Sequence, residues 1–193
     1  ETRYVISQTL RLMLIILMPA IALMSAFSRP IIHFFFSSGF EQAAYPMSIL
    51  VFGVGFLTIF YVMSYVMNGA GKTKIPMFLS IIGAFINIIL NYFLISRYGI
   101  VGSAVATSIT SFIAAGAMLY FLHRHFKVSF GISSFAKALT GCVIIFFAAK
   151  IMPAGNISFA FSGIVLFAFY GLFLYLLGEI KKEDILLLKK IVR

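Results

Sequence analysis

Long apolar runs alternate with short polar or basic segments along the whole chain. Six of these runs are each close to the length of about 20 residues that an α-helix needs to cross a bilayer. They comprise residues 12–28, 46–67, 75–96, 99 to about 122, 134–152 and 157–177. Lys137 and Lys150 are their only charged residues, and both lie near the ends of the fifth run. The pattern therefore predicts six transmembrane helices.

Composition agrees with this prediction. The chain is 62% hydrophobic and only 10% charged, whereas a soluble domain carries about 25% charged residues. We therefore expect an all-α integral membrane protein that has the lipid bilayer as its first partner. In a soluble protein the net charge of +10 would raise the question of nucleic acid. Here the positions of the basic residues are explained by the orientation of the chain in the membrane, and we expect no nucleic-acid partner.

The basic residues lie mostly on one side of the predicted membrane. Six spans place both ends of the chain on that same side. It receives Arg3, Arg11, Lys72, Lys74, Arg124, Lys127, Lys137, Lys181, Lys182, Lys189, Lys190 and Arg193. The opposite side receives Arg29, Arg97 and Lys150. Because lysine and arginine concentrate in cytoplasmic loops, we expect a multi-pass protein of the cell (cytoplasmic) membrane with both termini of this chain in the cytoplasm.

Two further segments are predicted to lie at the membrane surface. Residues 31–36 are aromatic but too short to cross, and a polar turn with Gly39 and Glu41 follows them. Residues 179–193 alternate charged with apolar side chains. Such a segment typically forms an amphipathic helix in the interface, which we expect for this tail on the cytoplasmic side.

Polar side chains recur inside two of the predicted spans. At spacings of three and four, which share one helix face, the second span carries Thr58, Tyr61, Tyr65 and Asn68. Asn87 and Asn91 share a face of the third span. An amide in hydrocarbon is costly without a partner. These side chains therefore either join helices to one another or line a wet path for a substrate, and the sequence leaves both interpretations open.

The patterns of catalytic and metal sites are missing. The acidic residues all lie at ends or in loops, at Glu1, Glu41, Glu179, Glu183 and Asp184. An intramembrane carboxylate, common in ion-coupled transporters, is therefore not among them. His123 and His125 have no nearby Cys, Asp or Glu to complete a metal site. GAGKT at residues 69–73 lacks the glycine spacing of a phosphate-binding loop. We expect no enzymatic activity, no cofactor and no metal.

Two motifs resemble those of one transporter family. The first is N-G-x-G-K-T-K-x-P at residues 68–76, and the second is Y-G-I-x-G-S-A-x-A-T-S-I at residues 98–109. Together with Asn87 and Asn91 between them, they resemble the second half of polysaccharide exporters. These are lipid-linked oligosaccharide flippases of the Wzx type, in the multidrug/oligosaccharidyl-lipid/polysaccharide exporter superfamily.

The resemblance implies an architecture. Members of the family have two pseudo-symmetric lobes of six helices, often followed by two extra helices, and work by alternating access between the lobes. Residues 1–122 would then be four helices of the C-terminal lobe. Residues 123–193 would supply the two additional C-terminal transmembrane helices and the cytoplasmic amphipathic tail. The N-terminal lobe of the same protein would be missing from this chain.

The resemblance also implies a substrate, a polyprenyl-diphosphate-linked oligosaccharide that is translocated for the assembly of cell-surface polysaccharide or glycan. The candidates for lining its path are Tyr61, Tyr65, Asn68, Asn87 and Asn91. The candidates for meeting its diphosphate are Arg29 and Arg97 at the mouths, because no Lys or Arg lies at mid-span. Two alternatives are a multidrug/cation antiporter of the same superfamily and a structural membrane protein with no transport path.

Cysteine substitution distinguishes a transport path from a purely structural role. If Asn87 and Asn91 line a path, a cysteine at either position of the full-length protein will react with a polar thiol reagent, because water reaches the side chain. Labelling of purified membranes measures this. Complete protection in every state of the protein would leave only the role of joining helices.

Overall fold

The chain is helical wherever its structure is described. The computed structural model describes residues 2–36, 38–128, 132–152 and 158–179. Its elements are α1 (Thr2–Ala26), α2 (Ser28–Phe36), the 3-10 helix η1 (Ser38–Ala43), α3 (Ala44–Gly69), α4 (Lys74–Phe126), α5 (Ile132–Ile151) and α6 (Ser158–Leu176). Among these described residues, α1, α3, α4, α5 and α6 are long and apolar enough to cross a membrane. The predicted all-α membrane fold is confirmed.

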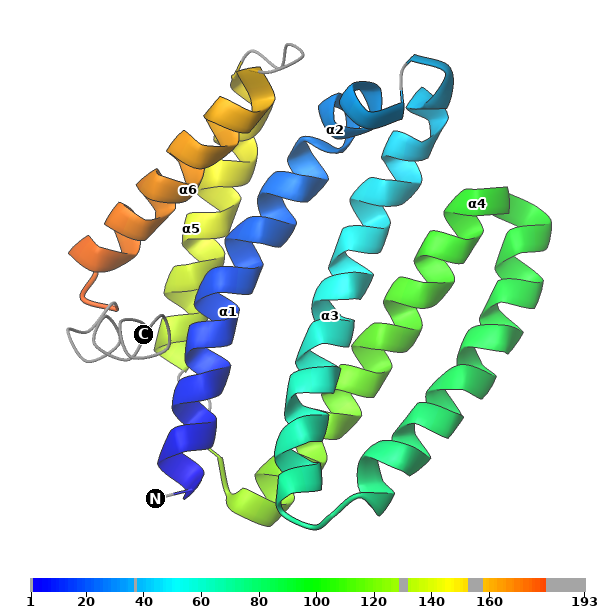
Figure 1. Cartoon of the computed structure of the whole chain (residues 1–193), viewed down its shortest axis with the longest axis vertical. Coiled ribbons are helices and arrows are strands. Elements are labelled where there is room, and N and C mark those ends of the chain that lie inside the picture. Colours follow the sequence, from blue (N-terminus) through cyan, green and yellow to red (C-terminus); the bar gives the residue numbers. More distant parts are fainter. Residues whose placement is uncertain (1, 37, 129–131, 153–157, 180–193) are drawn as a thin grey trace.

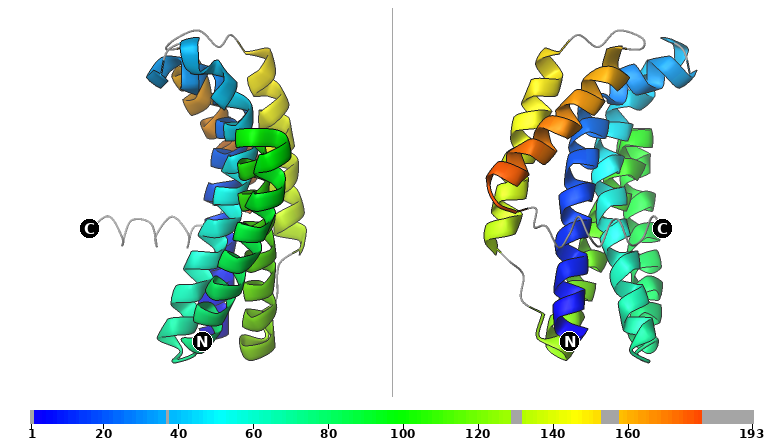
Figure 2. Two further views of the ribbon diagram at one scale, coloured as in Figure 1. Left: turned by 90° about the vertical axis from the view of Figure 1, so that its right-hand side faces the viewer. Right: turned by 60° about the vertical axis from the view of Figure 1, so that its left-hand side comes forward.

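The helices stand side by side with α1 in the middle. Figure 1 shows α3 and the two limbs of α4 on one side of α1, and α5 with α6 on the other. The contacts agree, because α1 touches α3, α5 and α6, whereas α4 packs mainly on α3. The right-hand view of Figure 2 shows the same order. The chain start and the α3–α4 turn lie at one end of the bundle, called here the N-terminal end, and α2 lies at the opposite end, the α2 end.

A bend at Gly99 divides α4 into two limbs, residues 74–98 and residues 100–126. Gly99 has φ 57° and ψ −135°, a conformation that glycine adopts far more readily than other residues. Three residues later, Gly102 packs so closely on the carbonyl group of Leu94 that a Cβ would not fit. The two spans predicted for residues 75–96 and 99–122 are therefore the limbs of one hairpin that has no intervening loop.

The first span is longer than the sequence predicted. We expected residues 12–28, but α1 begins at Thr2 and ends at Ala26. The hydroxyl group of Ser7 donates a 3.0 Å hydrogen bond to the carbonyl oxygen of Arg3, which satisfies it within the helix. Ile6 and Leu10 are buried against neighbouring helices. Polar residues in these early turns lower the mean hydropathy of the segment, so hydropathy did not predict that its apolar residues are buried in a helix.

The short segments at the α2 end are more regular than expected. The aromatic residues 31–36 belong to α2, which begins three residues earlier. The polar turn predicted around Gly39 and Glu41 is the 3-10 helix η1. Arg29 donates a hydrogen bond of 2.9 Å to Glu41, which ties α2 to η1. The amphipathic helix predicted for residues 179–193 lies outside the described residues, apart from Glu179.

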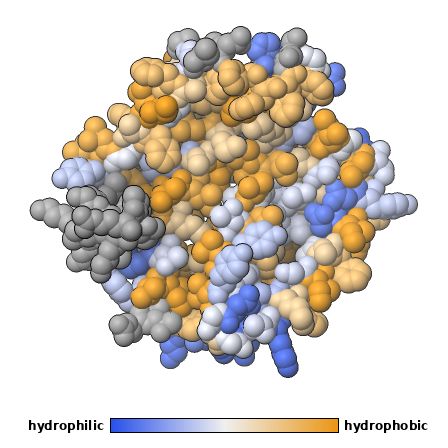
Figure 3. Space-filling model, viewed as in Figure 1, coloured by the Kyte–Doolittle hydropathy of each residue, from blue (hydrophilic) through white to orange (hydrophobic). Residues whose placement is uncertain are grey.

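Two clusters of buried side chains hold the bundle together. The first joins α1 to α3 and to the second limb of α4 through Ile6, Leu10, Phe60, Met63, Met67, Ala115, Met118, Leu122 and Val128. The second joins α1 to α5 and α6 through Ala22, Leu23, Phe27, Cys142, Ile145, Ala149, Leu166, Tyr170 and Leu174. The first limb of α4 adds only the partly buried Ile75 and Leu79 to the edge of the first cluster, and no residue from 77 to 101 is buried. Hydrophobic side chains cover most of the face seen in Figure 3, as suits a surface in lipid.

Small residues allow α3 and the second limb of α4 to approach closely. The hydroxyl group of Ser108 lies 3.1 Å from the carbonyl oxygen of Ile49 on α3 and 2.8 Å from that of Ala104 on its own helix. A Cβ on Gly53 of α3 would lie 2.7 Å from Oγ and 2.8 Å from Cα of Ser108. Such an approach is typical of helix pairs in membranes, where packing replaces the hydrophobic effect between helices.

Gly53→Ala is therefore expected to lower the midpoint of thermal unfolding. An added methyl group in a tight contact usually costs about 1–3 kcal/mol. The matched control is Gly116→Ala on the second limb of α4, because nothing lies within 4 Å of the position of its Cβ. Size-exclusion chromatography of the heated protein in detergent measures both. Equal midpoints for the two variants would show that the Gly53 contact is not needed.

Candidate functional site

A four-residue turn at positions 70–73 joins α3 to α4. Gly71 has φ +74°, which favours glycine. The amide N–H of Gly71 donates to the carbonyl oxygen of Asn68, and that of Lys72 donates to the carbonyl oxygen of Met67, each at 2.9 Å. These bonds close the end of α3 and direct the chain straight into α4. The last turns of α3 and the first turns of α4 consequently share one pocket.

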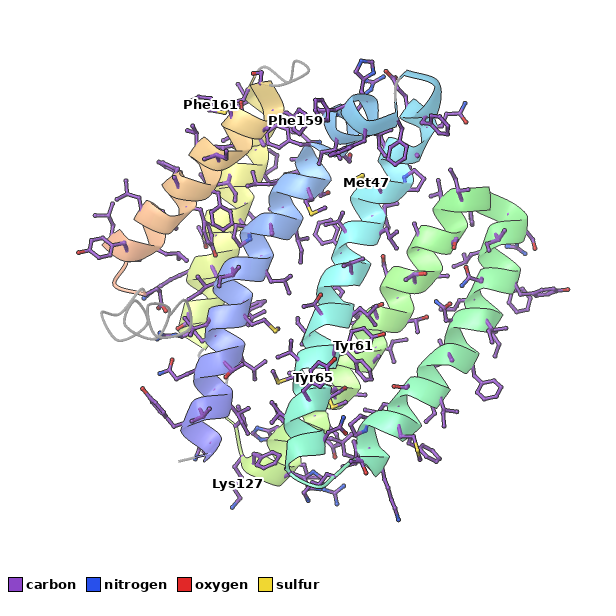
Figure 4. All side chains as sticks on the ribbon, viewed as in Figure 1. Met47, Tyr61, Tyr65, Lys127, Phe159 and Phe161 are labelled. Carbon is purple, nitrogen blue, oxygen red and sulfur yellow. The ribbon has the colours of Figure 1, made fainter. Side chains whose placement is uncertain are left out.

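This hairpin pocket has a volume of about 550 Å³. It is lined by Phe60, Tyr61, Ser64, Tyr65, Asn68, Thr73, Lys74, Pro76, Met77 and Ser80. Figure 4 places Tyr61 and Tyr65 in the half of α3 that leads to the turn, above the N-terminal end of the bundle. The structure thus brings together three of the sequence-derived candidates for a substrate path, Tyr61, Tyr65 and Asn68.

The polar groups of the hairpin pocket are available to a ligand. Tyr61 is 53% exposed and Tyr65 is 73% exposed. Within the part of the chain that the structure describes, the side chains of Tyr65, Asn68 and Lys74 make no hydrogen bond or ion pair. The hydroxyl group of Ser64 donates to the carbonyl oxygen of Phe60 at 2.7 Å, which leaves its own oxygen free to accept. The pocket therefore offers one cation, several hydrogen-bonding groups and two aromatic rings.

Sequence reasoning missed half of this pocket. Ser64, Thr73 and Ser80 were not among the candidates, and Lys74 was interpreted only as an anchor near water. The length of the turn, only four residues, could have predicted the other half of the pocket. In an antiparallel helix pair joined by four residues, positions at equal distances before and after the turn lie opposite each other.

Asn87 and Asn91 form a separate group in the middle of the first limb of α4. The amide nitrogen of Asn91 lies 2.9 Å from both the backbone oxygen and the side-chain oxygen of Asn87. The amide nitrogen of Asn87 in turn donates a long bond of 3.4 Å to Thr110 on the second limb. The side-chain oxygen of Asn91 is enclosed and has no hydrogen-bond partner among the described residues. The bond to Thr110 joins the two limbs, while a place for these amides on a substrate path stays a prediction.

The two arginine candidates lie at the α2 end, one in α2 and one just before the Gly99 bend. Arg29 is engaged by Glu41 at 2.9 Å, and Nδ1 of His33 lies 3.9 Å from the same carboxylate. Arg97 is exposed, and in the described part of the chain no ion pair occupies it. Of the two, Arg97 is the one whose guanidinium group is free to meet a phosphate.

A second cavity, of about 490 Å³, lies between α1, α3, the second limb of α4 and α5. Its walls are mostly apolar, with Leu14, Phe56, Phe112 and Phe135 among them. Ser7, Gln8, Arg11 and Ser134 add polar groups near the N-terminal end of the bundle. The cavity can hold an apolar chain whose polar end remains near the membrane surface.

An ion pair fastens the end of α6 to α5. Nζ of Lys137 lies 2.9 Å from the carboxylate of Glu179 and 3.4 Å from the carbonyl oxygen of Leu177. Burial by itself raises the pKa of Glu179. The hydrogen bonds from Lys137 and Ser134, with the charges of Lys137 and Arg11, outweigh burial and lower the pKa below its ordinary value of 4.5. The carboxylate is therefore ionised at neutral pH and holds the lysine in place.

The described part of the chain is thus a bundle of long apolar helices with a tight hairpin, a polar pocket and an apolar side cavity. A solved structure of lipid II flippase MurJ, in an inward closed conformation, has this fold. It matches 92% of the chain with a TM-score of 0.79 at 24% sequence identity, and the chain covers 40% of it. The family model of lipid II flippase MurJ matches residues 1–174. The chain belongs to this family of lipid flippases.

This result confirms the superfamily that the two motifs predicted. The matching family within it is that of the lipid II flippase, and nothing in the match singles out the Wzx-type exporters. The family is one of transporters, in line with the expectation that the chain is not an enzyme.

Three curated relatives cover shorter parts of the chain. An uncharacterized membrane protein of Methanocaldococcus jannaschii is 36% identical over 111 residues, which are 58% of this chain and 22% of that protein. A second one from the same organism is 37% identical over 77 residues. A probable multidrug resistance protein NorM of Oceanobacillus iheyensis is 34% identical over 88 residues, 42% of this chain and 20% of that protein. The chain spans about a fifth of the length of these relatives.

Replacing Glu179 with glutamine should give a pH-dependent loss of stability. A carboxyl group whose pKa is lower in the folded protein stabilises the fold above its unfolded-state pKa, and that stabilisation is lost as the pH falls through the folded value. The thermal midpoints of wild type and Glu179→Gln should therefore differ at neutral pH, and the difference should shrink as the pH falls below the ordinary value of 4.5 and vanish below the lowered pKa of the folded protein. Glu41→Gln, which removes a more exposed pair, should have a smaller effect. A Glu179 difference that stays constant into acid would contradict the ion pair.

Proposed function

We propose that this chain is the C-terminal portion of a flippase that moves a polyprenyl-diphosphate-linked saccharide across the cytoplasmic membrane for the assembly of a cell-surface glycan. The observation that carries the proposal is the match to the lipid II flippase family from residue 1 to residue 174. Lipid II is the substrate that the family name states. Because the chain spans only part of its relatives, the whole protein's substrate belongs to the proposal.

The two clusters of buried side chains support a division of the chain into two structural parts. In this proposal residues 1–122 are four helices of the C-terminal lobe, whose core is the cluster that α1 shares with α3 and α4. Residues 123–193 supply the two additional helices, attached to α1 through the other cluster, and a cytoplasmic tail. The N-terminal lobe of the same protein completes the path, and transport follows from alternating access between the lobes.

The distribution of charge supports an orientation. In this proposal the N-terminal end of the bundle faces the cytoplasm, because it carries Lys72, Lys74 and Lys127. Figure 4 shows Lys127 at that end. The α2 end, with Arg29 and Arg97, then faces the outer side of the membrane.

The physical task of a flippase is to carry a charged, hydrated head through an apolar layer about 30 Å thick. An unpaired charge there is expensive, so the protein must offer polar groups along the route while the isoprenoid chain stays in apolar surroundings. In this proposal the hairpin pocket and Asn87 with Asn91 contribute polar groups, and Arg97 meets the diphosphate at the far mouth. The apolar cavity beside α1 has room for part of the isoprenoid chain.

A multidrug/cation antiporter is the second candidate, favoured by the 34% identity to the probable multidrug resistance protein over 88 residues. Such a transporter would pair cations with intramembrane carboxylates. None of the acidic residues of this chain lies within α1, α3, α4, α5 or α6. An antiporter would have to draw that group from outside this chain, which makes the flippase the better supported function.

Reconstitution of the complete protein into vesicles tests the proposal. With a fluorescent polyprenyl-diphosphate-linked disaccharide in both leaflets, a membrane-impermeant quencher should reach about half of the label in empty vesicles and nearly all of it when the protein flips the lipid. A fluorescent phosphatidylcholine is the control and should stay half protected. Ethidium movement driven by a sodium gradient, without movement of the glycolipid, would favour the antiporter instead.

A further inference from the structure

The hairpin pocket extends from the membrane surface into the apolar layer. Tyr61 lies eight positions before Gly69, where α3 ends, and Ser80 lies six positions after the start of α4. At 1.5 Å per residue, these distances are about 12 Å and about 9 Å. The headgroup layer on each side of a bilayer is only about 6 Å thick. The pocket therefore reaches below the headgroups, to a depth where a polar group must find a partner.

Ser64 finds that partner in its own helix, but three other polar residues of this pocket do not. Among the described residues, Tyr65, Asn68 and Lys74 have no hydrogen-bonding or ionic partner for their side chains. Elsewhere in the helices, hydroxyl groups bond to their own helix, as Thr58 does to the carbonyl oxygen of Val54 at 2.9 Å. Asn68 and Lys74 lie within one residue of the ends of their helices, at the level of the headgroups, where water or a polar ligand can bond to them. Tyr65 lies four residues, or about 6 Å, before the end of α3, where its hydroxyl group needs water or a polar ligand as its partner.

The chemistry of the walls identifies the class of ligand. Asn68 and the Thr73 hydroxyl group can both donate and accept hydrogen bonds, and the Ser64 hydroxyl group, which donates to Phe60, can still accept one, which suits the hydroxyl groups of a sugar. Exposed rings at Tyr61 and Tyr65 offer flat apolar faces to the C–H groups of a pyranose. Lys74 adds one ammonium group, which binds phosphate as a point charge. At about 550 Å³, the pocket lies within the usual range for small-molecule sites.

We propose that the hairpin pocket binds a glycosyl phosphate, and that it is the place where the saccharide head of the transported lipid is held at the cytoplasmic mouth. This proposal rests on the function proposed above, because it names the part of the substrate that this chain recognises. The sugar packs on the tyrosine rings and bonds to Asn68, while the phosphate group lies beside Lys74. The same chemistry would suit a glycosyl phosphate free in solution, which the experiment below separates from the lipid-linked form.

The plainest competing explanation is that the tyrosines and lysines only anchor the hairpin at the membrane surface, as such residues commonly do. The chain offers matched controls for both residue types. Lys72 lies two residues before Lys74 in the same turn but does not line the pocket. Tyr92, on α4, is 73% exposed, the same as Tyr65, and is not part of the pocket. Surface anchoring treats the members of each pair alike, whereas a binding pocket does not.

The experiment measures equilibrium binding to the complete protein in nanodiscs of phosphatidylcholine. The probes are a short-chain prenyl-diphosphate-linked disaccharide, N-acetylglucosamine 1-phosphate and inorganic phosphate. Lys74→Gln should weaken binding of the glycolipid probe about tenfold, as the loss of a charged hydrogen bond does. Tyr65→Ala should weaken it about threefold or more, in line with the worth of an aromatic contact. Lys72→Gln and Tyr92→Ala should bind as the wild type does, and all four variants should keep their thermal midpoints.

Each outcome has a separate meaning. Tighter binding of the glycolipid than of the free sugar phosphate supports a lipid-linked ligand, and equal binding supports a glycosyl phosphate from solution in the same pocket. Binding of inorganic phosphate as tightly as either sugar probe overturns the proposal. Equal losses in Lys72→Gln and Lys74→Gln overturn it in favour of surface anchoring. Wild-type affinity in Lys74→Gln and Tyr65→Ala, with flipping of the lipid intact, overturns the pocket but leaves the proposed function. A protein that neither binds nor flips the glycolipid overturns both.

Discussion

The absence of water in the hydrocarbon layer is the constraint on which this structure depends. Each backbone and side-chain polar group in a span must find its partner inside the protein. Most hydroxyl groups do so within their own helix, four residues back, as Ser64, Ser96 and Thr140 do. Only a few groups bond between helices, such as Ser108 with Ile49 of α3. Groups without a partner among the described residues occur at several places, including Tyr65, Asn68 and Lys74 of the hairpin pocket, the side-chain oxygen of Asn91 and that of Gln8 beside the apolar cavity. The hairpin pocket is the place where several such groups lie together and are exposed.

The two polar regions differ in kind. Asn87 and Asn91 bond to one another and to Thr110, so they stabilise the hairpin formed by the limbs of α4. In the hairpin pocket, by contrast, the polar side chains of Tyr65, Asn68 and Lys74 bond neither to each other nor to another helix among the described residues. A residue that stabilises the bundle cannot be removed without loosening it, whereas Tyr65 and Lys74 can be replaced while the fold is kept. This difference makes the hairpin pocket the better place to look for recognition of a ligand.

The apolar runs predicted the number and order of the helices because lipid imposes length and hydropathy on each span. The same runs could not give the start of α1, since Ile6 and Leu10 are buried among polar neighbours. They also predicted Tyr61, Tyr65 and Asn68 as one face, but not that Thr73 and Lys74 lie across from it. Contacts between helices depend on the turn and on close approach at glycines such as Gly102, which hydropathy does not record.

One helix connects the two halves of the bundle. Ile6 of α1 belongs to the cluster with α3 and α4, and Ala22 and Leu23 of α1 belong to the cluster with α5 and α6. Pro19 lies between them, and because proline has no N–H, the carbonyl group of Ile15 loses its partner in the helix. The described parts of α5 and α6 contact the rest of the bundle mainly through α1. A change in the bend of α1 at Pro19 would therefore tilt α5 and α6 together relative to α3 and α4.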